Sequence, residues 1–256
     1  MAFATMAISK ARAIVFTALA VCWTGFLCLI MLWTLFLPKR TLISILHVWQ
    51  RHLSWIERNV AGLDYRVIGH HYIPKGACII AAKHQSVWET LKLHLLFGDP
   101  AIVLKKELMD IPVWGWYARR SGMIPVDRGA RSKALSLMMK AAHEAADARC
   151  KIVIFPQGTR VSSGEWKPYK IGVAALYQEL NLPIIPMALN SGIFWPKKSL
   201  IKKSGVITVE FLPPIPPGLS REDMMRQLQA SLEDATNKLM RDAGGTETIM
   251  PDGALA

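Results

Sequence analysis

Residues 77–90 read ACIIAAKHQSVWET, which is the pattern of a strand, a turn and the start of a helix. The apolar run from Ala77 to Ala82 predicts a short strand. Ser86 followed three residues later by Glu89 matches the capping box that opens many helices. His84 stands between the two elements, in the turn. A strand that leads through a polar turn into a helix is the repeating unit of α/β proteins.

The same alternation continues along the chain. Further short apolar runs predict strands at residues 65–68, 101–104, 123–126, 152–155, 184–189 and 206–211. Helices are predicted at about 88–97, 131–149, 168–180 and 221–242, the last with Ser220 as its N-cap and Asp223 three residues on. We therefore expect an α/β sandwich with a mostly parallel or mixed sheet of about seven strands flanked by helices.

Polar residues follow four of the predicted strands at the point where each one ends. They are His84 after residue 82, Lys105 after residue 104, Asp127 and Arg128 after residue 126, and Gln157-Gly158-Thr159-Arg160 after Phe155. Open α/β sheets bind their ligands beyond the carboxyl ends of the strands. The sequence therefore predicts one site in which a candidate base, several cations and a glycine turn come together.

Glu89 has two interpretations. If the helix begins at Ser86, His84 can fold back over the first turn, where the Glu89 carboxylate would fix its tautomer and strengthen it as a base. Alternatively, Glu89 only caps the helix by accepting from the backbone N–H of Ser86. A histidine satisfied within a loop is also the ordinary interpretation of His84. These residues alone do not choose between the alternatives.

The glycine turn suits a phosphate group. Backbone N–H groups at Gly158 and Thr159 can donate to phosphate oxygens, and the planar guanidinium of Arg160 can donate two parallel hydrogen bonds. Arg128 offers a second guanidinium and Lys105 a point charge. The remaining cations near predicted strand ends and helices are interpreted as surface charge: Lys83, Arg119 and Arg120.

The first 60 residues differ in character from the rest. No charged residue occurs from Ala13 to Leu37, a stretch longer than the roughly 20 residues needed to cross a bilayer. An amphipathic helix follows, with apolar residues recurring from Leu42 to Val60. We expect residues 1–60 to be membrane-anchoring helices and 61–256 a catalytic domain. The pair could span the membrane or lie in one leaflet, and the flanking charges do not decide.

The charge balance favours anionic partners. The chain has 31 Lys and Arg against 19 Asp and Glu, a formal net charge of +12. Nucleic acid is not expected, because no recognition motif accompanies the charge. A non-catalytic anionic-lipid binder is an alternative, since residues 194–198 and Lys202-Lys203 form a basic, aromatic cluster. A metal site is not expected, because the segment starting at His143-Glu144 lacks the second histidine of the zinc-protease motif.

Four sequence blocks resemble the 1-acylglycerol-3-phosphate acyltransferase family. They are His84 with Glu89, Gly122 with Asp127-Arg128, Phe155 to Arg160, and Leu182 to Pro186, in the family's order. The segments KKEL (105–108) and IPVWGW (111–116) also look like the family's. The resemblance covers about residues 60–215 and implies a glycerolipid acyltransferase-like α/β fold preceded by a two-helix membrane anchor.

The resemblance also implies an activity and its participants. The acceptor would be lysophosphatidic acid at a membrane lipid surface, and the product phosphatidic acid. The donor would be acyl-CoA or an acyl carrier protein, as a co-substrate with no further cofactor. The location would be a bacterial-type cytoplasmic membrane with the catalytic domain on the cytoplasmic side. An acyltransferase for another lysophospholipid, and a lipid esterase, remain alternatives.

By the same resemblance each site residue has an expected role. His84 would be the general base and Glu89 would orient it. The acceptor phosphate would be held by Arg128, Gly158, Thr159 and Arg160, assisted by Lys105. Gln157 and Asp127 would support these residues. Pro183 and Pro186 would shape the wall near the acyl donor. Two positions depart from the family pattern: Glu89 stands where Asp is usual, and neutral Gln157 stands where Glu is usual.

Overall fold

The computed structural model describes residues 2–127, 131–197, 199 and 202–251. Its centre is a mixed sheet of seven strands in the order β1-β7-β6-β2-β5-β3-β4. Strands β6, β2, β5, β3 and β4 are mutually parallel, and β7 with its parallel neighbour β1 runs the other way. The strands are β1 (Leu63–Ile68), β2 (Cys78–Ala82), β3 (Ala101–Lys105), β4 (Ile124–Val126), β5 (Lys151–Ile154), β6 (Ile184–Leu189) and β7 (Gly205–Phe211). The predicted fold class is confirmed.

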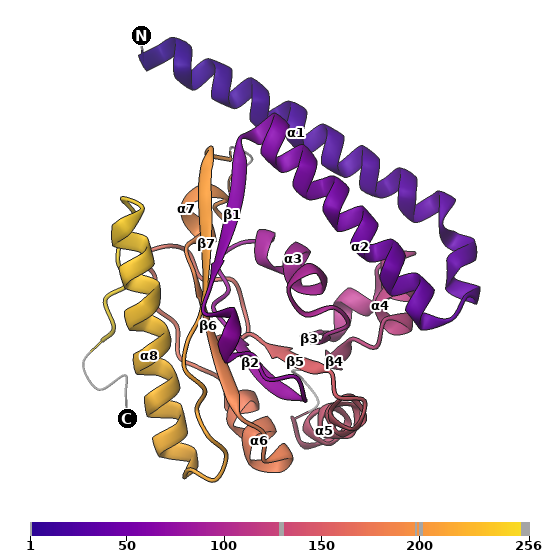
Figure 1. Cartoon of the computed structure of the whole chain (residues 1–256), viewed down its shortest axis with the longest axis vertical. Helices are drawn as coiled ribbons and strands as arrows, with labels where there is room; N and C mark the ends of the chain where they lie inside the picture. The colour runs from indigo at the N-terminus through magenta and orange to yellow at the C-terminus, as the bar shows by residue number, and fades with distance from the viewer. Residues whose placement is uncertain (1, 128–130, 198, 200–201, 252–256) are drawn as a thin grey trace.

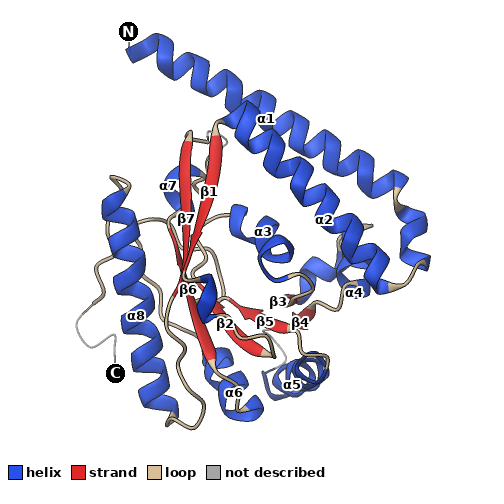
Figure 2. Ribbon diagram, viewed as in Figure 1, coloured by secondary structure: helices blue, strands red, loops and turns tan. Residues whose placement is uncertain are grey.

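Helices cover both faces of the sheet (Figures 1 and 2). The side-chain period of two divides strand β2 between the layers: Ile79 and Ala81 belong to one buried cluster, whereas Ile80 and Ala82 belong to the other. The first cluster includes α5 (Arg131–Asp147), α6 (Ile171–Leu180) and α8 (Arg221–Asp242). The second includes α1 (Ala2–Ile30), α2 (Lys39–Ile56) and α3 (Trp88–Phe97).

Most predicted elements are present at the expected places. Helices α3 and α8 and strand β6 have the predicted bounds, and the Ser220 hydroxyl accepts from the Asp223 N–H at 3.0 Å as an N-cap. Several short elements were not predicted: α4 (Trp114–Arg120), α7 (Ser191–Phe194) and the 3-10 turns η1 (Leu32–Phe36), η3 (His70–Tyr72) and η4 (Lys106–Asp110). Each of the two α-helices has seven residues or fewer, too short for an apolar periodicity to show.

The front end folds as two long helices joined by η1. Among the described residues, one stretch, Ala11–Ile30 of α1, is long and apolar enough to cross a membrane by length and composition. Phe16 and Leu53 are buried in the same cluster as the sheet residues, whereas Val21 and Leu29 are about two-thirds exposed. One face of the pair therefore packs on the α/β layers. The predicted domain boundary at residue 60 stays a prediction.

A buried ion pair joins α2 to α3. The chain leaves α2 through a single π turn, η2 (Glu57–Ala61), whose first carboxylate lies 2.6 Å from the ammonium of Lys92. Lys92 also donates to the Ser54 hydroxyl, and the Trp88 indole N–H donates to Glu57. Burial raises the pKa of Glu57, which the charge of Lys92 opposes. Because both charges are inaccessible to water, each depends on the other.

Replacing one partner of this pair tests the junction. We expect Lys92→Met to lower the free energy of unfolding by about 3–5 kcal/mol, since it leaves the Glu57 carboxylate buried without its cation. The double variant Glu57→Gln/Lys92→Met should recover most of that loss. As a control, Arg226→Met breaks an exposed pair with Glu222 on α8 and should cost less than about 1 kcal/mol. Equal effects of Lys92→Met and the control in chemical denaturation would contradict the assignment.

Candidate active site

His84 lies directly beyond the carboxyl end of β2. Its imidazole is 15% exposed, and its Nδ1 lies 2.8 Å from Oε1 of Glu89. The ring stacks on Phe155, which follows β5, with 4.0 Å between centroids and 22° between planes. The His84 carbonyl accepts from the Val161 N–H at 2.8 Å. Nδ1 donates to the carboxylate, so Nε2 is the ring nitrogen that can accept a proton.

Glu89 makes the contacts that both interpretations of it require. Its side chain is fully buried. Besides His84, Oε1 accepts from the backbone N–H groups of Gln85 and Ser86, each at 2.7 Å. Oε2 accepts from the Ser191 hydroxyl at 2.8 Å. The carboxylate therefore caps the turn before α3 and orients the imidazole at the same time.

Two neighbours of the pair were missed in the sequence. Ser191, which is fully buried, follows β6, so it lies at the same sheet edge as His84. The sequence did offer a signal, because Ser191 follows the strand predicted at residues 184–189. The polar residues after that strand were not considered as part of the site. Phe155 was assigned to a strand, and its chemistry there was not considered. The Gly192 N–H also donates to the Gln85 side chain at 3.0 Å, so α7 fixes the His84 loop at two points.

The glycine turn and His84 share one cavity. Gly158 adopts a left-handed conformation with φ of 66°, and its N–H closes the turn on the Phe155 carbonyl at 2.8 Å. Gly158, Thr159 and Arg160 all line the cavity that His84 lines. Such a turn presents backbone N–H groups toward an anion. The structure thus brings three of the predicted phosphate ligands to the candidate base.

The other predicted residues take varied positions. Lys105 lines the same cavity and pairs with Glu107 at 2.8 Å, and Asp127 lines it and pairs with Lys106 at 3.1 Å. Arg128 lies outside the described residues. Gln157 is 2% exposed, and it is not among the described residues that line the cavity.

The two prolines of the predicted donor wall lie in and beside the sheet. The Pro183 carbonyl accepts from the N–H of Ile79, near the start of β2, which is the opposite end of that strand from His84. Pro186 is buried within β6, paired in register with Ala81. Neither is among the described residues that line the cavity, and the wall assignment stays a prediction.

Two lysines interpreted as surface charge are buried. Lys83 is 2% exposed and its ammonium pairs with the Glu233 carboxylate on α8, which also accepts from the Tyr169 hydroxyl at 2.9 Å. Lys202 is 7% exposed, and its ammonium lies over the Trp195 ring, 4.9 Å from the centroid. The predicted basic cluster is therefore partly internal. Lys198 lies outside the described residues.

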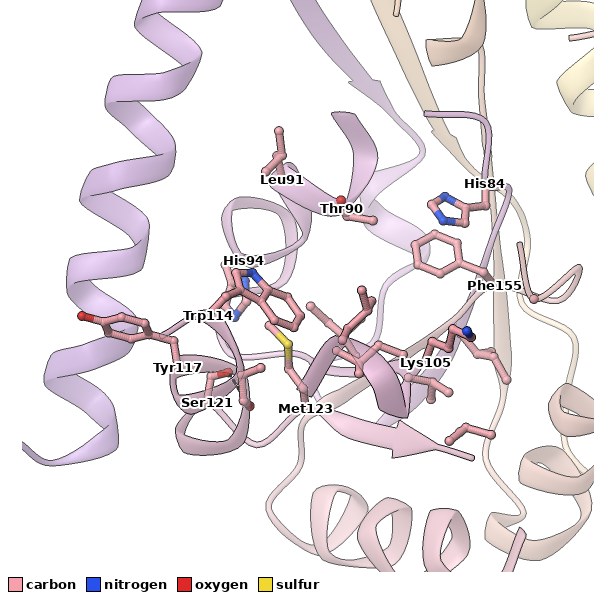
Figure 3. Close-up of a pocket in the computed structure, with 18 of the residues that line it drawn as sticks. His84, Thr90, Leu91, His94, Lys105, Trp114, Tyr117, Ser121, Met123 and Phe155 are labelled. Atoms are coloured by element: carbon pink, nitrogen blue, oxygen red, sulfur yellow. Dashed lines mark hydrogen bonds between the residues drawn. The ribbon is translucent and has the colours of Figure 1, made fainter. Parts of the chain in front are cut away.

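The cavity extends from His84 toward the N-terminal helices. Its volume is about 1010 Å³, and apolar side chains form most of its wall. Figure 3 shows His84, Phe155 and Lys105 toward one side and Tyr117, Ser121 and Met123 toward the other. The lining also includes Leu27 of α1, Met31 between α1 and η1, and Leu46 and Trp49 of α2. The volume is at the upper end of small-molecule sites and suits a long apolar chain.

A histidine–carboxylate pair at a strand end, beside a glycine–arginine turn and an apolar cavity, places this chain among the α/β enzymes. Residues 64–190 match the model of the acyltransferase family. A 1-acyl-sn-glycerol-3-phosphate acyltransferase of Pseudomonas aeruginosa is 38% identical over 161 residues, which are 63% of each chain. One from Saccharomyces cerevisiae is 27% identical over 82% of this chain and 72% of its own.

A solved structure supports the same fold. The crystal structure of the 1-acyl-sn-glycerophosphate (LPA) acyltransferase PlsC from Thermotoga maritima matches with a TM-score of 0.72, at 20% identity, over 90% of this chain and 98% of that one. Over residues 64–190 the chain belongs to the acyltransferase family, as the resemblance predicted. The alignment spans less than two thirds of the Pseudomonas relative, 63% of its length.

The cavity wall contains one buried histidine. His94 on α3 is 4% exposed, and burial lowers its pKa from the usual 6.5 to about 4, against a smaller opposing effect of the Asp99 carboxylate. Between pH 6.5 and 4, His94 is therefore protonated in the unfolded chain and neutral in the folded protein. Stability from this group is complete above pH 6.5 and is lost as the pH falls toward 4.

The pH dependence of unfolding tests this burial. The loss across that window should total about 3 kcal/mol, at about 1.4 kcal/mol per pKa unit. We expect His94→Leu to flatten the slope of the unfolding free energy against pH between 6.5 and 4. His71→Gln, at an exposed histidine, should leave the slope unchanged. A slope that His94→Leu does not alter would show that His94 takes up protons freely in the folded state.

Proposed function

We propose that this protein transfers an acyl group to the sn-2 hydroxyl of 1-acylglycerol 3-phosphate, giving phosphatidic acid. The observation that carries the proposal is the His84–Glu89 hydrogen bond of 2.8 Å at a cavity that also includes Gly158, Thr159 and Arg160. The relatives from Pseudomonas aeruginosa and Saccharomyces cerevisiae, which are 1-acyl-sn-glycerol-3-phosphate acyltransferases, support it.

The reaction needs a base and no covalent enzyme intermediate. His84 Nε2 removes the proton of the acceptor hydroxyl as its oxygen attacks the thioester carbonyl of the donor. The tetrahedral intermediate then collapses, the carbon–sulfur bond breaks, and the proton passes from the imidazolium to the leaving thiolate. The Glu89 carboxylate stabilises the imidazolium between these steps. A positioned base of this kind contributes about 10²–10⁴-fold to the rate.

The acceptor phosphate is placed by the turn after β5. Arg160 and the N–H group at Thr159 bind its oxygens, and Lys105 and Arg128 add positive charge. Gly158 supplies the left-handed conformation that shapes the turn. Asp127 supports this arrangement by pairing with Lys106, which fixes the lysine beside the cavity. Gln157 supports it from beneath, as a buried residue of the turn. Holding the phosphate orients the hydroxyl toward His84, which supplies the proximity that the chemical step requires.

The apolar cavity receives acyl chains, and the donor is acyl-CoA or an acyl carrier protein. No further cofactor takes part in the proposed reaction. The protein works at a membrane lipid surface, with the catalytic domain on the cytoplasmic side of a bacterial-type cytoplasmic membrane. The exposed apolar residues of α1 support the membrane contact. Lipid acceptors are found there, and thioester donors are cytoplasmic.

The first test is the reaction itself. Reconstituted protein given lysophosphatidic acid and either donor should form phosphatidic acid, identified by mass. We expect His84→Ala to lower turnover by at least about 10²-fold without unfolding the protein, because the base is removed. His71→Ala, at an exposed histidine, is the matched control. Release of free fatty acid without ester would identify a lipid esterase, and vesicle binding without turnover in any variant would favour a lipid-binding protein.

The second test separates the two roles of Glu89. Glu89→Gln keeps an oxygen to accept from Gln85 and Ser86, and its amide can donate to Ser191, so the cap survives. The negative charge beside His84 is lost. We expect kcat to fall by about 10²–10⁴-fold while the free energy of unfolding changes by only about 1 kcal/mol. A nearly fully active Glu89→Gln enzyme would mean that the carboxylate serves only as a cap.

A further inference from the structure

The connection between β3 and β4 exposes an unusual number of large apolar side chains. Leu108, Ile111, Trp114 and Trp116, here called the α4 patch, are 39%, 45%, 36% and 50% exposed. They lie on η4, on α4 and between them. Single exposed apolar residues are common, but a group of four with two tryptophans in nine residues marks a surface that meets an apolar partner.

Helix α4, which carries part of the α4 patch, is hydrogen-bonded to the end of α1 and to the turn that follows it. The Tyr117 hydroxyl donates to the Cys28 carbonyl at 3.2 Å, and the Arg120 guanidinium donates to the carbonyls of Leu35 and Leu37 at 3.2 and 2.7 Å. The turn that receives these bonds is itself apolar and exposed, since Phe36 is 90% exposed. Figure 1 shows α4 close to the end of α2 that adjoins this turn. The patch therefore continues the apolar surface of the α1–η1 segment.

The α4 patch also borders the cavity. Leu108 and Trp114 belong to the patch and line the cavity, whose wall also includes Leu27 of α1 and Leu46 of α2. An apolar molecule that leaves a layer covering the patch can reach the cavity without crossing water. That route suits a lipid better than a protein partner, which would cover the opening.

We infer that the α4 patch is a second membrane contact, which lies in the interfacial layer of the bilayer beside α1 and opens the cavity to lipid. Tryptophans are enriched at the membrane–water interface, where their amphipathic rings are stable. Arg119 lies three residues after Trp116, on the same face of α4, and is 53% exposed. Its guanidinium lies 3.6 Å from the exposed Asp110 carboxylate and can exchange this partner for a lipid phosphate while the tryptophan inserts. The role as a lipid entrance rests on the proposed function, but the contact itself does not.

A fluorescent probe tests the contact independently of catalysis. The full chain, with its native cysteines replaced by alanine, carries one environment-sensitive label at Ile111→Cys and is reconstituted in phosphatidylethanolamine–phosphatidylglycerol vesicles. We expect nitroxide groups near the headgroups to quench this label. The control label is at Ile249→Cys, which is 86% exposed and adjoins Thr248, bonded to Asn237 of α8. It should remain in water.

Two results with the probe would overturn the inference. A label at position 111 that lipid nitroxides quench no more than the label at position 249 would show that the patch does not touch the bilayer. Fluorescence at position 111 that changes with protein concentration in the absence of vesicles would assign the patch to an interface between two copies of the chain.

Activity tests the entrance. Neither Ile111 nor Trp116 lines the cavity among the described residues, so Ile111→Glu/Trp116→Glu leaves the site intact. We expect its rate on a long-chain acceptor in vesicles to fall about tenfold, and its rate on a dispersed short-chain acceptor to change less than about twofold. Ile249→Glu should affect neither rate. Equal losses of rate on both acceptors in the double variant would refute the lipid entrance. No turnover in any of the proteins would refute the proposed function, and the quenching result alone would then decide whether the patch contacts the membrane.

Discussion

The buried carboxylate of Glu89 is the constraint on which the rest of the site depends. A carboxylate removed from water costs several kcal/mol unless donors replace its hydration. Its four donors come from three places: the imidazole of His84, the turn before α3, and Ser191 after β6. The chain can satisfy the charge only when these segments meet at one sheet edge. The need to satisfy the Glu89 carboxylate therefore favours this fold and also orients the His84 imidazole.

Two further buried ion pairs hold the same strand–turn–helix unit from both sides. Glu57 and Lys92 tie α3 to the N-terminal helices, and Lys83 and Glu233 tie the residue before His84 to α8. Charged pairs this deep contribute little net stability compared with apolar packing, but they tolerate few alternative arrangements. The N-terminal helices are consequently part of the cavity wall as well as a membrane-seeking segment, and the cavity could not keep its shape without them.

The sequence predicted what depends on local pattern. Strand β6 and helices α3 and α8 follow from apolar runs and caps, and the strand-end rule located His84, Glu89 and the Gly158 turn. Lys83 could not be recognised as buried, because its partner Glu233 lies 150 residues away. Ser191 carried only a weak local signature, since a serine after a strand is common. The roles of Pro183 and Pro186 cannot be read from order along the chain, because Pro183 precedes β6 and Pro186 lies within it.

Gln157 shows how a neutral residue can suit this turn. It is 2% exposed, and its amide nitrogen has no hydrogen-bond partner among the described residues. The turn is ordered by backbone bonds instead, from Gly158 to Phe155 and from Lys170 to Pro156. A carboxylate in such a buried position would need several hydrogen-bond donors or a cation, whereas an unpaired amide costs far less. The neutral side chain also adds no negative charge beside Arg160, so the positive potential that an acceptor phosphate would meet is undiminished. The departure from the family pattern is thus compatible with phosphate binding on electrostatic grounds.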